Sequence, residues 1–166
     1  MSFDIFFQTV RYNGGQVVTK NRFTGQTISE PASDPLTAAE LKAVRNVLKQ
    51  VDAKGPDEFG CYVVQFPDGG AAEVFANELE TGGMVALRGM TPDLTRFLFD
   101  LLRAGNWVML PAMEDSVAMT TSPNNITGAP DDFPKIVTVS TADEVDVLLS
   151  KGVKAWQKYR DRVMKK

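Results

Sequence analysis

The chain of 166 residues contains no histidine and only one cysteine, and both shortages exclude whole classes of function. Without an imidazole, the chain cannot build a Ser-His-Asp or Cys-His catalytic site, a haem site with a histidine ligand or an HExxH zinc site. A single thiol, Cys61, supplies too few soft ligands for zinc and cannot form an internal disulfide. We therefore expect no metal, no cofactor, and a reducing compartment such as the cytoplasm.

Long hydrophobic runs are also missing. No stretch approaches the ~18 apolar residues that a membrane-spanning helix needs. The first residues show no basic segment followed by an apolar core, so we expect no secretory signal. The content of 43% hydrophobic and 23% charged residues is ordinary for a globular protein and excludes disorder. The length predicts a single domain over residues 1–166.

Three segments have the apolar spacing and the end signals of helices. The first is predicted from about Ala38 to Val51, because Thr37 and Glu40 match a capping box. The second begins at Thr91-Pro92 and is expected to end with Gly105 in the left-handed conformation. The third is an amphipathic C-terminal helix over about 142–164, and its spacing predicts one apolar stripe of Val145, Leu149, Val153, Trp156, Tyr159 and Val163.

Segments rich in β-branched and aromatic residues predict strands between these helices. Asn13-Gly14-Gly15 predicts a tight turn that joins the first two strands, and residues 30–35 predict a surface connection. Pro67-Asp68-Gly69-Gly70 predicts the turn of a hairpin between the strands on either side of it. The order predicts an α+β fold, with an antiparallel or mixed β-sheet and about three helices packed mainly on one face. The predicted strands are Phe3–Val10, Gln16–Lys20, Phe23–Ile28, Gly60–Phe66, Ala71–Ala76, Met84–Leu87, Trp107–Leu110, Val117–Thr120 and Ile136–Val139.

The first strand is apolar on both of its alternating faces. In Phe3-Asp4-Ile5-Phe6-Phe7, only Asp4 is polar. Such a strand should lie in the centre of a sheet or be covered, because an exposed edge of this kind invites pairing with another chain. A homodimer contact through this strand is therefore one alternative.

Carboxylates provide the remaining candidates for chemistry. Asp131 and Asp132 lie in a long irregular loop over about 122–134, and Glu114 lies in a predicted turn. Together with Arg88 and Tyr62 they would form the site of a small-ligand-binding protein or of a carboxylate-dependent enzyme, which could use Mg²⁺. Adjacent acidic residues in turns more often face solvent. No catalytic motif is recognisable, and the glycine pairs lack the pattern of a phosphate-binding loop.

The charge is distributed unevenly along the chain. Residues 151–166 carry a net charge of +6, whereas residues 1–150 carry −9. Lys154, Lys158 and Arg162 on the C-terminal helix could therefore contact a nucleic acid. The pI of about 5.0 argues against this reading, and basic residues near a helix C-terminus also favour the helix dipole.

These observations favour a non-catalytic interaction module. We expect a bacterial protein of the cytoplasm that binds another protein, in an immunity-type or regulatory role. A small-ligand-binding protein or carboxylate-dependent enzyme is the alternative, and weak nucleic-acid contact through the C-terminal helix is the third. We expect no catalytic residues and no association with a membrane.

Overall fold

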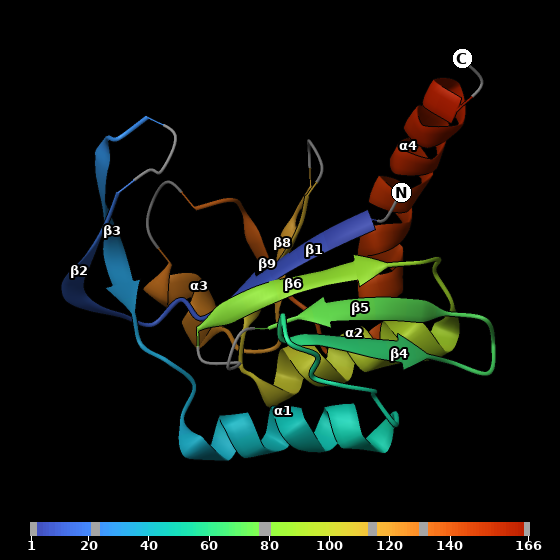
Figure 1. Ribbon diagram of the computed structural model, residues 1–166, viewed down its shortest axis with the longest axis horizontal. Helices are drawn as coiled ribbons and strands as arrows, with labels where there is room; N and C mark the ends of the chain where they lie inside the picture. The colour runs from blue at the N-terminus through green and yellow to red at the C-terminus, as the bar shows by residue number, and fades with distance from the viewer. Residues whose placement is uncertain (1–2, 21–23, 77–80, 113–115, 130–132, 165–166) are drawn as a thin grey trace.

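The computed structural model describes residues 3–20, 24–76, 81–112, 116–129 and 133–164. Strands and helices follow one another along these residues as Figure 1 shows. Their bounds are β1 (Phe3–Gln8), β2 (Tyr12–Lys20), β3 (Thr27–Ser33), α1 (Ala38–Gln50), β4 (Cys61–Gln65), β5 (Ala71–Phe75), β6 (Gly82–Leu87), α2 (Pro92–Ala104), β7 (Val108–Pro111), β8 (Ala118–Thr120), α3 (Asn124–Gly128), β9 (Ile136–Thr138) and α4 (Ala142–Met164).

Seven of the strands form one sheet in the order β4-β5-β6-β1-β7-β8-β9. Each neighbouring pair is antiparallel except β8 and β9, which run parallel. The predicted α+β class, with a mixed and mostly antiparallel sheet, is confirmed. The predicted hairpin of β4 and β5 is also confirmed, and its turn is closed by a hydrogen bond from the Phe66 N–H to the Gly70 carbonyl.

Strand β1 lies in the centre of this sheet, as its apolar sequence predicts. It pairs with β6 on one side and β7 on the other. Phe3, Ile5 and Phe7 point into the core and are at most 3% exposed, whereas Phe6 points to the opposite face and is 48% exposed. The sheet therefore has one core face and one open face.

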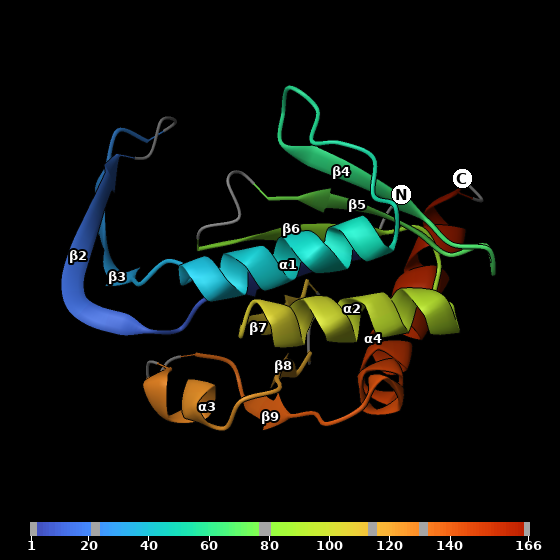
Figure 2. The same cartoon turned by 90° about the horizontal axis from the view of Figure 1, so that it is seen from below.

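Helices α1 and α2 lie next to each other and cover the core face (Figures 1 and 2). Val44 and Leu48 of α1 pack into the same core as Leu98 and Leu101 of α2. The first half of α4 packs against α2, and the core includes its Leu149. The prediction that the helices pack mainly on one face is confirmed for these three.

Helix α2 begins as predicted, with Thr91 as N-cap and Pro92 in the first turn, but the predicted left-handed residue at its end is wrong. Gly105 has a φ of −86°, and Asn106 is the left-handed residue with a φ of +48°. Gly105 is needed for a different reason, because a β-carbon there would overlap the ring of Trp107. Asn106 tolerates the left-handed conformation better than most residues with a β-carbon.

Strands β2 and β3 correct two predictions. The segment that includes Asn13 to Gly15 is no turn but part of β2, which pairs with β3 and not with β1. Residues 30–33 belong to β3 and not to a connection. Pro31 is tolerated because β3 has only one neighbour, so the missing N–H leaves no second ladder incomplete. The two strands form a separate ribbon to one side of the main sheet (Figure 1).

The loop predicted over 122–134 contains the short helix α3, so the described residues hold four helices and not about three. The side chain of Asn125 is 3% exposed, and its hydrogen bonds attach this segment to the rest of the fold. Its amide donates to the carbonyl oxygen of Asn106 at 3.0 Å and to the hydroxyl of Thr120 at 2.8 Å. This helix has no apolar stripe, so the spacing of apolar residues in the sequence could not predict it.

Glu40 joins three parts of the chain. Its carboxylate accepts from the Thr37 N–H, which completes the predicted capping box of α1. It also accepts two hydrogen bonds from the Arg11 guanidinium, at 2.7 and 3.0 Å, and one from the Asn106 amide at 3.3 Å. Burial alone would raise the pKa of Glu40, but the hydrogen bonds from Arg11 and Thr37 outweigh it, and the pKa is lowered.

We expect Glu40→Ala to lower the free energy of unfolding by about 2 kcal/mol, because it removes the reciprocal cap and leaves Arg11 without its acceptor. Glu40→Gln keeps an oxygen for the cap and should lose less. Urea denaturation of both variants measures the difference. Equal stability of Glu40→Ala and the wild type would contradict this assignment.

The lowered pKa of Glu40 also predicts a pH dependence. A carboxyl group with a lower pKa in the folded state stabilises the fold above its unfolded value and loses that contribution as the pH falls. The ordinary value is 4.5, so the free energy of unfolding should decrease below it. Glu40→Gln should show a shallower decrease in urea titrations at successive pH values, and an identical slope would refute the assignment.

Candidate binding groove between β9 and α4

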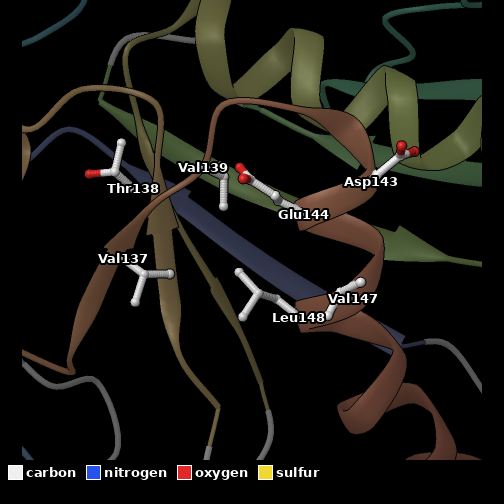
Figure 3. Close-up of a pocket in the computed structure, with 7 residues that line it drawn as sticks. All are labelled: Val137, Thr138, Val139, Asp143, Glu144, Val147 and Leu148. Atoms are coloured by element: carbon white, nitrogen blue, oxygen red, sulfur yellow. The ribbon is translucent and has the colours of Figure 1, made fainter.

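Strand β9 and helix α4 are joined by a corner of only three residues, 139–141. The Glu144 N–H donates to the hydroxyl of Thr141 at 3.3 Å, and the Ser140 N–H donates to the Glu144 carboxylate at 2.5 Å. These reciprocal bonds fix the start of the helix. The strand and the helix diverge from this corner and leave a wedge between them (Figure 3).

The wedge is an apolar groove with a volume of about 390 Å³. Val139 lies nearest the corner and is 2% exposed. Leu148 of α4 points toward Val137 of β9 from the other wall (Figure 3). The lining consists of Val137, Thr138, Val139, Asp143, Glu144, Val147 and Leu148.

Val147 makes the groove more apolar than a solvent-facing surface usually is. It is 62% exposed, one of the most exposed large apolar residues described. It lies two positions after Val145, about 200° around the helix, so it cannot reach the core that Val145 occupies. An aliphatic side chain at this position contributes nothing to the interior.

The corner end of the groove is acidic. Asp143 and Glu144 lie in the first turn of α4, and both are exposed. Among the described residues, no Lys or Arg forms an ion pair with either of them. Asp146 is engaged differently, since its carboxylate accepts from the Thr95 hydroxyl of α2 at 3.3 Å. The groove therefore combines an apolar interior with a negative rim.

Strand β9 is also the end of the sheet. The Val139 N–H donates to the Thr120 carbonyl, so by alternation the backbone groups of Ile136 and Thr138 point away from β8. At the other end of the sheet, β4 is partly closed by a bridge between Lys54 and Val63. In the described part of the chain, no strand or bridge pairs with the outer edge of β9.

Two predicted site residues lie on opposite faces of the sheet. Tyr62 packs against the main core, and Arg88 is exposed and pairs with Glu73 at 3.0 Å. Val63, the neighbour of Tyr62, pairs in register with Glu73, which places Glu73 on the open face. The alternation of the strands therefore does not bring Tyr62 and Arg88 together, and the binding roles suggested for them stay predictions.

The other predicted site residues are distributed differently. Lys154 is exposed on α4. Lys158 and Arg162 follow it on the same helix, and their side chains lie outside the described part of the structure. Asp131, Asp132 and Glu114 also lie outside the described residues. A carboxylate site built from these residues stays a prediction.

Sequence reasoning missed the groove residues. The helical stripe identified in the sequence contains Val145 and Leu149, which are buried as expected. Val147 lies outside that stripe. An aliphatic residue on the side of the helix that faces away from the core was the one sign in the sequence of an exposed apolar surface there. Nothing in the sequence indicated that β9 would diverge from α4.

Among the described residues, no cluster of three or more Cys, Asp or Glu side chains has the geometry of a metal site. No described helix combines the length and the apolar character needed to cross a membrane. In comparisons with known proteins, no family model, no curated protein and no solved structure matches the chain. The function must therefore be argued from the geometry.

Cys61 has the environment of an unreactive thiol. It is 8% exposed, and its pKa is raised by burial and by the nearby carboxylates of Asp57 and Glu73. Alkylation of the folded protein by iodoacetamide should be at least about tenfold slower than alkylation of the urea-unfolded chain. Equal rates would show that the thiol is accessible and reactive.

Proposed function

We propose that this protein is a non-catalytic protein-binding module that holds its partner in the groove between β9 and α4. The observation that supports the proposal is the exposed apolar lining of the groove, led by Val147, next to an uncovered sheet edge. Protein interfaces typically have an apolar centre filled by a few anchor side chains and a polar rim. The unpaired Cys61 is compatible with a reducing compartment such as the cytoplasm.

The charge of the rim indicates what the partner presents. Asp143 and Glu144 favour a basic residue next to the apolar anchor. The outward-facing backbone groups of Ile136 and Thr138 can pair with an extended segment, which is a common mode of peptide recognition. The partner is therefore a protein segment with a large apolar residue close to Lys or Arg.

A protein segment fits this groove better than a small molecule. Small-molecule sites enclose most of the ligand and orient it with several converging polar groups. Here the groove is open, and its polar side chains are Thr138 at one wall and the two acids at the corner end. The volume of about 390 Å³ suits a few side chains of a larger partner.

A library of random peptides displayed on phage tests the proposal. Peptides selected on the full-length protein should share an apolar residue close to Lys or Arg. Val147→Glu should weaken their binding by more than about tenfold, because it introduces a charge among the apolar groups that line the groove. Asp143→Asn should weaken it less and reduce the dependence on salt.

Val18→Glu is the matched control. Val18 is 65% exposed on β2, away from the groove, so the same substitution changes a surface valine of similar exposure. Selected peptides should bind this variant as they bind the wild type. Peptides without the expected pattern, or binding that Val147→Glu leaves unchanged, would overturn the proposal.

A further inference from the structure

The open face of the sheet carries a continuous row of apolar side chains. In the register of the sheet, Phe75 lies opposite Met84, Met84 opposite Phe6, and Phe6 opposite Leu110. The row therefore crosses β5, β6, β1 and β7 on the face that α1 and α2 do not cover (Figures 1 and 2). Phe6 is 48% exposed, and the other three are partly exposed.

Only one end of this face is closed by the described part of the chain. Val10, Val108 and Ala118 form a small buried cluster there, to which Tyr12 and Phe133 contribute from outside the sheet. Leu110 lies at the margin of that cluster. From Leu110 toward β5, no described helix lies over the row, and exposed apolar rows of this kind commonly mark an interface.

The second half of α4 is the complementary feature. Val145 and Leu149 fix the first half of the helix in the core. The second half continues past the sheet on the side of the open face (Figure 1). The helix is continuous from Ala142 to Met164, so its second half extends in line with the fixed first half.

Sequence and charge both fit this helix to that face. The sequence of this half repeats apolar residues at helical spacing, at Val153, Trp156 and Tyr159. Residues 151–166 carry +6 and the rest of the chain −9. Asp4 and Glu73 lie in the register row next to that of Phe6, and Glu73 is paired there with Arg88, so the attraction depends on the net charges of the two parts of the chain.

We infer that two copies of this chain associate reciprocally, each placing the second half of α4 on the Phe6 row of the other. With a twofold axis, the helix of each copy covers the Phe6 row of the other, so the dimer leaves neither surface exposed. The acidic body of one copy attracts the basic helix of the other, so association should weaken as salt is added. The inference concerns a different surface from the groove and does not depend on the proposed function.

Sedimentation of the full-length protein tests the inference. The wild type should have twice the chain mass of 18.2 kDa. Phe6→Asp on the face and Trp156→Asp on the helix should each halve that mass. Circular dichroism verifies that both variants fold. If Trp156→Asp does not fold, the double variant Lys154→Glu and Lys158→Glu replaces it as the helix variant.

A mixture of the face and helix variants separates reciprocal association from other modes. One of the two contacts then joins an intact face to an intact helix, so the mixed dimer should form although neither variant dimerises alone. Val18→Asp and the groove variant Val147→Glu should both remain dimeric. A monomeric wild type, a dimeric Phe6→Asp, or a mixture that stays monomeric would each overturn the inference.

Discussion

The burial of β1 organises this molecule. A strand with apolar residues on both faces is stable only with a neighbour on each side and a helical layer over one of its faces. Phe7 shows how closely the neighbours approach, since its ring lies 4.3 Å from that of Trp107 and leaves no room for a β-carbon at Gly83. The order of the sheet, the position of α1 and α2, and the exposure of Phe6 all follow from this arrangement.

Glu40 also holds separate segments together, through hydrogen bonds rather than apolar contacts. It caps α1 and accepts from Arg11, which precedes the ribbon, and from Asn106, which follows α2. Asn106 in turn accepts from Asn125 of α3. Burying a polar group costs free energy unless the group forms hydrogen bonds, and each of these four residues has a hydrogen-bond partner within the network. Segments without an apolar stripe of their own are thereby held against the core.

The sequence predicted what local signals and periodicity encode, namely the capped starts of α1 and α2, the β4–β5 hairpin and the central position of β1. It failed where long-range pairing decided the outcome. Asn13 to Gly15 look like a turn, yet they form an irregularity within β2, between Tyr12 and Gln16, which both pair with β3. The strand pairs with β3 because β6 and β7 occupy both sides of β1. The groove was missed because it depends on the angle between β9 and α4. Arg88 and Tyr62 were grouped by residue type, which says nothing about the face each occupies.

The ribbon of β2 and β3 has a consequence for how the protein unfolds. Its base is tied to the body by a hydrogen bond from the Asp34 N–H to the Arg11 carbonyl, but Val17, Val18 and Ile28 are all exposed, so little apolar burial stabilises it. A two-stranded ribbon of this kind is marginal by itself. Its ladder can therefore open while the seven-stranded sheet stays intact, and the chain has two levels of cooperativity rather than one.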